Sequence, residues 1–256
     1  MAKTSKSQEM YPSRSTQGVA LVQQSRKRRQ PRQVFVVTGN DTSVGKTVIS
    51  MALSVVLDRM GVSFAVVKPF CSGGRADAQA LHRIQRHRWT LDVLNPWHYE
   101  APLAPQVAAA IEGSRVTKSE VCAWFNRWSG KVDWLVVEGA GGLLTPLAVE
   151  FSLHNLIRTW QATPLVVLSN RLGVLNQARM VSASLTPTLR KRAWWILVDP
   201  AKPDFSTSTN CAYLQELWGE SRLVRIPYLK NIEKLLMGRE SRALPIVNSL
   251  HRILAN

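Results

Sequence analysis

A single glycine-rich motif constrains the fold of this chain more than any other feature. Residues 39–47 read GNDTSVGKT and match the pattern GxxxxGK[ST]. An apolar, β-branched run precedes the motif at 34–37, and a helical pattern follows it at 46–60. The backbone N–H groups of such a loop, together with the N-terminus of the following helix, bind phosphate. The motif therefore predicts a nucleotide site at the end of the first strand.

The residues of this motif have separate expected roles. Lys46 is expected to reach the β- and γ-phosphates, and the Thr47 hydroxyl to bind Mg²⁺. The residues expected to contact the nucleotide are Gly39, Asn40, Asp41, Ser43, Val44, Gly45, Lys46 and Thr47. The alternative is a glycine-rich turn with an incidental lysine. The agreement of strand, loop and helix in order disfavours that alternative.

Short apolar runs alternate with longer amphipathic segments from residue 34 onward. The runs predict strands at 34–37, 64–67, 134–137, 165–168, 194–198 and 223–226. The other segments predict helices at 46–60, 77–87, 104–111, 117–128, 153–160, 175–185 and 210–218. Thr117 and Glu120 fit a capping box at the start of one of them. The alternation predicts an α/β fold, a single domain with a mostly parallel sheet and helices on both faces.

Two acidic residues stand where a metal ligand would be needed, since Mg²⁺ takes one or two carboxylates besides phosphate oxygens. Glu138 ends the run at 134–137, and open α/β sheets bind ligands at the carboxyl ends of their strands. Asp77 follows the loop at 68–74, where its alternative role is a helix cap. Residues 139–142, GAGG, allow another close approach of backbone to ligand, or form only a flexible turn.

Lys68 follows a predicted strand directly and precedes Pro69, so extended backbone directs it toward the same edge of the sheet. A lysine at such a place is usually a solvated loop residue. Ser72, Gly73 and Gly74 follow within a few residues and favour a ligand-binding loop instead.

The formal net charge of +16 is divided unequally along the chain. Eight Lys and Arg side chains and one acidic residue lie in residues 1–33, so this segment carries +7 and the rest +9. The segment is rich in Ser, Gln and Arg and has no strong apolar period. We expect residues 1–33 to be a disordered basic extension and residues 34–256 to be the folded domain. The extension is a plain solvated tail or, alternatively, an organellar targeting segment.

The three cysteines, Cys71, Cys122 and Cys211, are far apart and odd in number. They fit neither a disulfide framework nor a zinc site, and indicate a reducing compartment such as the cytoplasm. No apolar run approaches the roughly 20 residues of a membrane helix.

Several motifs occur together in this order: GNDTSVGKT, KPFCSGG with Asp77, NPWHYEAPLAP, VEGAGGLLTPL, RLGVLNQA and IPYL. Over about residues 34–230 they resemble the dethiobiotin synthetase family. The resemblance implies a P-loop, homodimeric ligase of biotin biosynthesis that uses ATP and Mg²⁺. It implies conversion of 7,8-diaminopelargonate and CO₂ to dethiobiotin through a carbamate and a carbamic–phosphoric anhydride.

The resemblance also implies roles for individual residues. Lys46, Lys68 and Thr42 would be catalytic, at the phosphoryl and carbamate oxygens. Thr47, Asp77 and Glu138 would surround Mg²⁺. The residues implied for the substrate are Ser72, Gly141 and Gly142 at its diamine end and Gly173, Val174, Leu175 and Asn176 at its carboxylate. In the family the last four come from the other subunit. Pro227 and Leu229 would line the adenine pocket.

Two positions leave alternatives open. Where the family often has an Asn before the adenine pocket, this chain has Val198 followed by Asp199. Either Asp199 substitutes for that Asn, or another nucleotide is accepted. The alternative function is a DNA-binding ATPase switch of the chromosome-partitioning type, which carries an extra lysine early in its loop. Asn40 occupies that position here and argues against it.

Overall fold

The computed structural model describes residues 31–255, and its main sheet has six strands, all parallel. In sheet order they are β10 (Leu223–Ile226), β9 (Trp194–Val198), β8 (Thr163–Ser169), β1 (Gln33–Gly39), β5 (Trp134–Glu138) and β2 (Phe64–Val67). Each corresponds to one predicted run. The predicted single-domain α/β fold with a parallel sheet is confirmed. β1 begins at Gln33, and residues 1–30 of the predicted extension lie outside the described residues.

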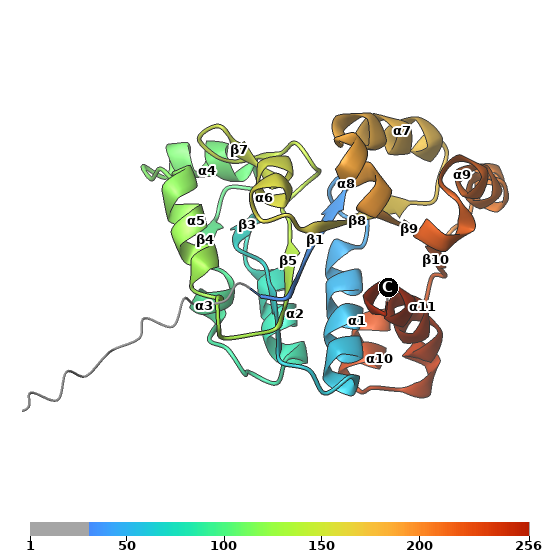
Figure 1. Ribbon diagram of the computed structural model, residues 1–256, viewed down its shortest axis with the longest axis horizontal. Coiled ribbons are helices and arrows are strands. Elements are labelled where there is room, and N and C mark those ends of the chain that lie inside the picture. The colour runs from blue at the N-terminus through green and yellow to red at the C-terminus, as the bar shows by residue number, and fades with distance from the viewer. Residues whose placement is uncertain (1–30, 256) are drawn as a thin grey trace, which may run out of the picture.

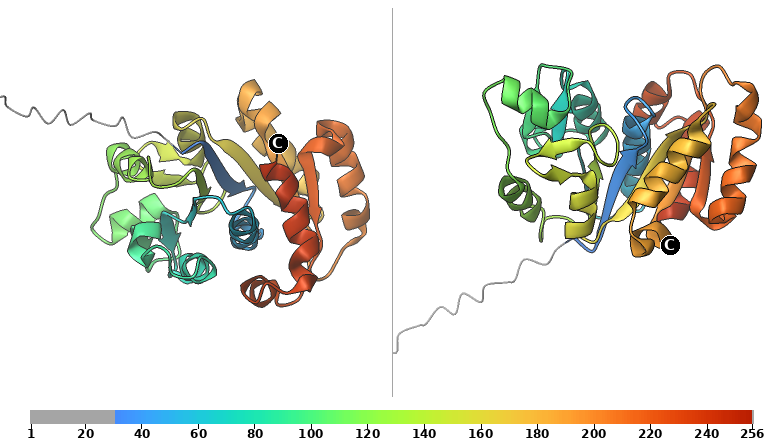
Figure 2. Two further views of the ribbon diagram at one scale, coloured as in Figure 1. Left: turned by 60° about the horizontal axis from the view of Figure 1, so that its bottom comes forward. Right: turned by 90° about the horizontal axis from the view of Figure 1, so that it is seen from above.

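Two apolar cores lie on opposite faces of this sheet, because successive residues of a strand point to opposite sides. In β1, Val34 and Val36 belong to one core, and Phe35 and Val37 belong to the other. The helices over the first core are α3 (Leu91–Leu94), α4 (Pro105–Ile111), α5 (Lys118–Asn126), α6 (Leu153–Thr159), α7 (Val174–Ser184), α8 (Pro187–Arg192) and α9 (Asn210–Trp218). Those over the second are α1 (Lys46–Arg59), α2 (Ala76–Ile84), α10 (Ile232–Met237) and α11 (Leu244–Leu254). Figures 1 and 2 show these two helical layers around the sheet.

The predicted helices agree with the structure to within two residues at their ends, with one exception. The helix predicted at 77–87 ends at Ile84, because Arg86 and His87 have φ angles of 54° and 57° and cannot continue it. The capping box of Thr117 and Glu120 is confirmed.

Several elements were not predicted, and all of them except the 11-residue helix α11 are short. Four are strands of two small sheets: β3 (Phe70–Ser72) pairs with β4 (Trp97–Tyr99), and β6 (Pro146–Ala148) with β7 (Phe151–Ser152). The others are α3, α8, α10, α11 and the 3₁₀ turns η1 (Phe205–Ser208), η2 (Glu220–Arg222) and η3 (Ser241–Ala243). Strands of two or three residues are too short to show a periodic pattern.

The parallel sheet brings three loops together at one edge. β1 lies between β5 and β8, with Val37 opposite Glu138, and β2 lies on the other side of β5, with Val67 opposite Val137. The loop after β1, Glu138 at the end of β5 and Lys68 after β2 therefore meet at the carboxyl ends of three adjacent strands. Ligands bind there in open α/β sheets.

Candidate active site

The loop between β1 and α1 closes around the ammonium group of Lys46. Lys46 Nζ donates a hydrogen bond to the carbonyl oxygen of Asp41 at 2.7 Å. Gly45 caps α1 in the left-handed region, with φ of 99°, a conformation that favours glycine. A Cβ on Gly39 would lie only 2.7 Å from a methyl of Val44, so the loop needs glycine there too. The predicted loop geometry is therefore present at residues 39–47.

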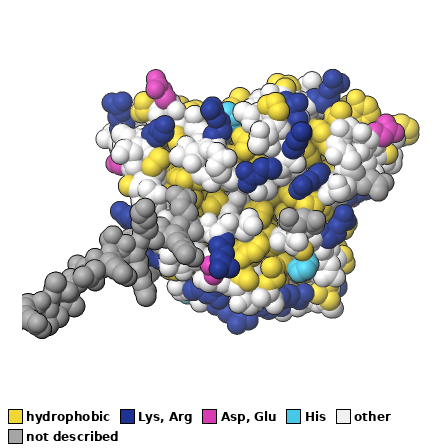
Figure 3. All heavy atoms as spheres, in the orientation of Figure 1, with side chains coloured by type: hydrophobic (Ala, Val, Ile, Leu, Met, Phe, Trp, Pro, Cys, Tyr) yellow, Lys and Arg dark blue, Asp and Glu magenta, His cyan; other side chains and the backbone are white. Residues whose placement is uncertain are grey.

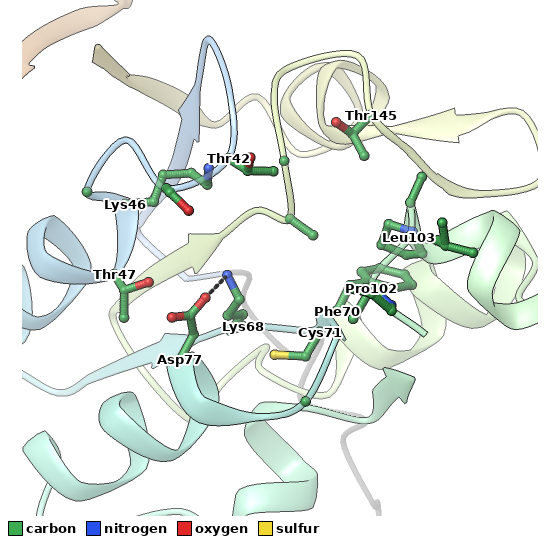
Figure 4. A pocket seen from close by; sticks show the side chains of 18 of the residues that line it. Thr42, Lys46, Thr47, Lys68, Phe70, Cys71, Asp77, Pro102, Leu103 and Thr145 are labelled. Carbon is green, nitrogen blue, oxygen red and sulfur yellow. Dashed lines mark ion pairs between the residues drawn. The ribbon is translucent and has the colours of Figure 1, made fainter. Parts of the chain in front are cut away.

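A cluster of charges lies beside this loop. Lys68 Nζ lies 2.7 Å from Glu138 Oε1 and 3.1 Å from Asp77 Oδ2. Thr47 donates its hydroxyl proton to Glu138 Oε1 at 2.8 Å. Figure 4 shows Lys46, Thr47, Lys68 and Asp77 around one space, with the Lys68–Asp77 ion pair dashed. Residues of α1, α2, β5 and the loop after β2 therefore converge, as predicted from the sequence.

Burial and charge act against each other on the ionisable groups of the cluster. Burial lowers the pKa of Lys46 to about 8, and the nearby charge of Lys68 adds to the effect. Burial also lowers the pKa of Lys68, but the negative charges of Glu138 and Asp77 outweigh it and the net shift is upward. For Asp77, burial raises the pKa and the charge of Lys68 outweighs it, so the net shift is downward. Lys68 and Asp77 are thus both held in their charged forms.

The residues predicted to bind Mg²⁺ fit that ion in their chemistry. Glu138 is fully buried, and its second oxygen, Oε2, has no hydrogen-bond partner among the described residues. An unpartnered buried carboxylate oxygen is costly unless a ligand completes it. The carboxylate of Asp77 pairs with Lys68, which also binds Glu138, and the hydroxyl of Thr47 donates to Glu138. Two carboxylates and a hydroxyl are a donor set suited to Mg²⁺ with phosphate oxygens.

A cleft of about 790 Å³ opens from this cluster. Its lining includes Thr42, Lys46, Thr47, Lys68, Ser72, Asp77 and Gly141. The buried hydroxyl of Ser72 has no hydrogen-bond partner among residues 31–255, so a polar group of a ligand could complete it. Pro102 and Leu103 give one wall of the cleft an apolar character. The cleft can therefore hold a molecule with both an ionic end and an apolar segment.

The glycine loop after β5 packs closely against its neighbours. A Cβ on Gly139 would overlap the side chain of Leu153 at the start of α6. The N–H of Gly142 donates to the hydroxyl of Thr145 at 2.9 Å. Gly141 lines the main cleft, and Gly142 lies close to the first residues of the phosphate loop.

A second cavity of about 570 Å³ lies between the phosphate loop and α7. Asn176, Gly142 and Asn40 line it. Gly173, Val174 and Leu175 line neither this cavity nor the main cleft. Val174 is fully buried, and its N–H donates to the carbonyl of Arg171. The single chain thus leaves the start of α7 outside the cleft that holds Lys46.

The structure bears on the open question at Val198 and Asp199. Both oxygens of Asp199 accept hydrogen bonds from Arg225 at 3.0 Å, and Oδ1 also accepts one from Asn170 at 2.7 Å. These contacts disfavour a role for Asp199 as a substitute base-binding residue. Val198 lies beneath the phosphate loop, 3.6 Å from the point where a Cβ of Gly45 would be. Neither Pro227 nor Leu229, both described, lines the main cleft.

Two residues at the site were not predicted from the sequence. Gln177 of α7 accepts a 2.6 Å hydrogen bond from the amide of Asn40, the second residue of the phosphate loop. These residues are 137 positions apart, so no local pattern could join them. Thr145 lines the main cleft and holds Gly142. It stands in the motif VEGAGGLLTPL, which was the available signal.

A parallel sheet with this loop after its first strand defines a P-loop nucleotide-binding protein. Solved structures of P-loop proteins have a similar fold. The MinC:MinD cell division protein complex of Aquifex aeolicus aligns with a TM-score of 0.55 and 15% identity, and the alignment covers 88% of this chain and 96% of the chain in that structure. A plasmid partition protein of Borrelia burgdorferi bound to AMPPNP aligns with a TM-score of 0.58 and 9% identity, and the alignment covers 87% of this chain and 98% of that protein. At these identities the likeness concerns the fold alone.

Sequence comparison identifies the family within this class. A family model described as an AAA domain matches residues 33–235. The ATP-dependent dethiobiotin synthetase BioD of Bacillus subtilis is 32% identical over 207 residues, covering 78% of this chain and 89% of that protein. The protein of the same name from Idiomarina loihiensis is 33% identical over 207 residues, and the alignment covers 76% of this chain and 92% of that protein. The chain belongs to the ATP-dependent dethiobiotin synthetase family, and the expected ligase class is confirmed.

Two further sequence expectations concern the cellular setting. All three cysteines are free thiols, as predicted, and Cys71 is buried, which raises its pKa to about 11. Within residues 31–255, none of the helices has the length and apolar character needed to cross a bilayer. The cytoplasmic location stays a prediction.

Proposed function

We propose that this protein forms dethiobiotin from 7,8-diaminopelargonate, CO₂ and ATP in the cleft beside the phosphate loop. The proposal is supported by the family of the chain and by the observation that Lys46, Lys68 and the Ser72 hydroxyl, which has no partner within residues 31–255, share one cleft. A single pocket can therefore take a phosphoryl donor and a polar acceptor side by side. Holding both reactants in one geometry lowers the barrier by removing a bimolecular encounter.

The proposed reaction has three steps that balance in atoms and charge. One amine of the substrate adds to CO₂ and loses a proton, which gives a carbamate. A carbamate oxygen attacks the γ-phosphorus, and the bond to the ADP oxygen breaks. The second amine then attacks the carbonyl carbon, the C–O bond to phosphate breaks, and phosphate leaves as the ring closes and a proton is released.

The cationic side chains serve the second step in this proposal. Phosphoryl transfer depends on positioning and on neutralising the charge that spreads over the oxygens. Lys46 and Lys68 supply two ammonium groups to the cleft, and the hydroxyl of Thr42 lies at its edge. Thr47, Asp77 and Glu138 would hold Mg²⁺, which when bound neutralises phosphate charge. Gly39, Asn40, Asp41, Ser43, Val44 and Gly45 would surround the phosphates with backbone N–H groups.

The acceptor would lie along the opposite side of the cleft. Ser72 and the backbone of Gly141 and Gly142 would hold its diamine end. The substrate carboxylate would bind at the N-terminus of α7, residues 173–176, of a second subunit. The position of that helix end outside the cleft of its own chain is compatible with this proposal. A homodimer would then be required for activity.

The alternative of a DNA-partitioning ATPase has less support. Its support is the similarity of fold to the MinD and plasmid partition structures, at 15% identity or less. The position of its extra lysine is Asn40 here, which bonds to Gln177. On the face drawn in Figure 3, Lys and Arg side chains are scattered and do not form one stripe.

The test is incubation of the protein with diaminopelargonate, bicarbonate, Mg²⁺ and ATP, scored for dethiobiotin and phosphate together. We expect both products in equal amounts, and loss of both in Lys46→Ala. Ser72→Ala should weaken use of the diamine while nucleotide binding stays. Absence of dethiobiotin, or a Lys46→Ala variant indistinguishable from the natural chain, would refute the proposal.

A further inference from the structure

We propose that Lys68 competes with Mg²⁺ for the carboxylates of Glu138 and Asp77, so that the metal binds firmly only with a nucleotide. In the nucleotide-free protein the ammonium group would occupy the cation site. The phosphates of the nucleotide would then draw the lysine away and leave both carboxylates to the metal. This inference rests on the proposed metal site, but does not depend on the proposed reaction.

The surroundings of Lys68 resemble those of a bound cation. An ammonium group has three donors and no acceptor. Lys68 Nζ has three oxygen neighbours: Glu138 Oε1 at 2.7 Å, Asp77 Oδ2 at 3.1 Å and the carbonyl of Gly139 at 3.3 Å. Its side chain is 6% exposed. The ammonium is therefore enclosed by oxygens that include both carboxylates available for a metal.

The carboxylates of Glu138 and Asp77 would bind either the Lys68 ammonium group or Mg²⁺. Among the described residues, no group of three or more His, Cys, Asp and Glu side chains is arranged to hold a metal ion. The proposed Mg²⁺ site therefore consists of only two carboxylates, those of Glu138 and Asp77, and the Thr47 hydroxyl, and both carboxylates contact Lys68. Since Thr47 donates to the same Glu138 oxygen that binds Lys68, all four side chains form one connected set.

The charge balance around Lys68 argues against an added metal in the nucleotide-free protein. The carboxylates of Glu138 and Asp77 face the ammonium groups of Lys46 and Lys68, so these four groups together are neutral without any ion. Glu233 also lines the cleft but is not among the oxygen neighbours of Lys68 Nζ given above. A divalent cation added to the four groups would create an excess of positive charge next to a lysine that is 6% exposed. Repulsion between like charges is strong where water is excluded. A triphosphate carries enough negative charge to compensate both the metal and the displaced lysine.

The cleft provides space into which the side chain of Lys68 can move. Lys68 lines the cleft of about 790 Å³ that also contains Lys46 and the end of the phosphate loop. Its flexible four-carbon stem can turn toward phosphate oxygens. Its movement would free Glu138 Oε1, and Glu138 Oε2 already has no partner among the described residues, so both oxygens could then bind the metal. The exchange therefore needs side-chain movement and no rearrangement of the sheet.

The experiment measures Mn²⁺ binding by electron paramagnetic resonance, with Mn²⁺ in place of Mg²⁺ and without nucleotide or substrate. We expect weak binding to the natural chain. Lys68→Met should bind Mn²⁺ at least about tenfold more tightly, because both carboxylates lose their competing cation. Lys68→Gln keeps hydrogen-bond donors but loses the charge, and it should also raise the affinity for Mn²⁺. This second variant keeps the test possible if Lys68→Met does not fold.

Lys46→Met is the matched control, because it removes an equal charge from the same cleft, while the bond of Lys46 in this structure goes to the Asp41 carbonyl. We expect a smaller increase for it than for Lys68→Met. Adding Glu138→Gln to Lys68→Met should abolish the gain. The proposal is overturned if the natural chain binds Mn²⁺ as tightly as the Lys68 variants, or if both lysine substitutions raise the affinity equally. Since no substrate is present, failure of the proposed reaction leaves this result readable.

Discussion

At the scale of single residues, the site is organised by one buried glutamate. Glu138 is fully buried and accepts hydrogen bonds from Lys68 and Thr47. Replacing one member of a buried ion pair leaves the other charged and incompletely compensated. Breaking the contacts between Glu138 and Lys68 is therefore expected to destabilise the fold.

The first prediction concerns the stability that this pair supplies. Glu138→Gln should lower the free energy of unfolding by roughly 3–5 kcal/mol, measured by chemical denaturation. Asp77→Asn is the matched comparison, because its side chain is 50% exposed, and should cost about 1 kcal/mol or less. Equal losses for the two variants would show that burial does not govern the contribution of each carboxylate.

The second prediction is a pH dependence of nucleotide binding through Lys46. The pKa of Lys46 is about 8, lowered by burial and then by Lys68, and phosphate favours the protonated form. Below pH 8 the lysine is already charged, and above it binding must take up a proton. Affinity should therefore fall by up to about tenfold per pH unit above pH 8. Titration of a fluorescent nucleotide between pH 7 and 9.5 checks this.

Lys46→Arg is the control for this pH profile, since arginine stays charged throughout the range. Whatever affinity the variant retains should not change between pH 7 and 9.5. A natural chain with a flat profile would contradict the assignment of Lys46 as the group that titrates.

At the scale of elements, the strands could be predicted from the sequence far better than the short connections. The six strands of the sheet are buried β-branched and apolar runs, and Phe64–Val67, Trp194–Val198 and Leu223–Ile226 matched to the residue. The P-loop and the positions of Lys68 and Glu138 follow from these strands, since each comes directly after or at the end of one. The proximity of the P-loop, Lys68 and Glu138 could therefore be predicted from the sequence.

What could not be predicted depends on contacts between distant segments. The bond between Asn40 and Gln177 joins the phosphate loop to α7, and the enclosure of Lys68 by Asp77 depends on how α2 packs. The end of α2 at Ile84 depends on the φ angles of Arg86 and His87. Such features are set by tertiary packing and leave no local periodicity.

The third prediction concerns the link between the phosphate loop and α7. Gln177→Ala should weaken nucleotide affinity by about 5- to 10-fold, because loss of one hydrogen bond near 1 kcal/mol leaves the partly buried Asn40 amide without its partner. Isothermal titration with ATP measures the change. Arg179→Gln, an exposed change two positions further along α7, should leave the affinity unaltered. A drop in both variants would point to general damage to the helix.

At the scale of the whole molecule, the net charge is divided between the N-terminal segment and the folded part. Residues 1–33 carry +7 of the +16, and residues 1–30 lie outside the described structure. Lys46 and Lys68 line the main cleft, where the carboxylates of Glu138 and Asp77 balance their charge. Nothing in the structure explains the positive excess of the folded part.

The fourth prediction tests whether the N-terminal segment takes part in the chemistry. A chain that begins at Pro31 keeps all of β1 and the ion pair of Arg32 with Asp133, and should retain full synthetase activity. Its thermal stability should also match that of the full chain. Substantial loss of either property would assign residues 1–30 a part in folding or catalysis.

The central claim, a carbamate that is phosphorylated and then closed to a ring, is tested most directly by following oxygen from CO₂. The full chain is incubated briefly with ATP, Mg²⁺, diaminopelargonate and ¹³C¹⁸O₂ in ordinary water, and both products are analysed by mass spectrometry. We predict dethiobiotin with one ¹³C and one ¹⁸O in its ureido carbonyl and inorganic phosphate that carries one ¹⁸O. Labelled dethiobiotin with unlabelled phosphate would contradict the anhydride, and phosphate without dethiobiotin would contradict the proposed function.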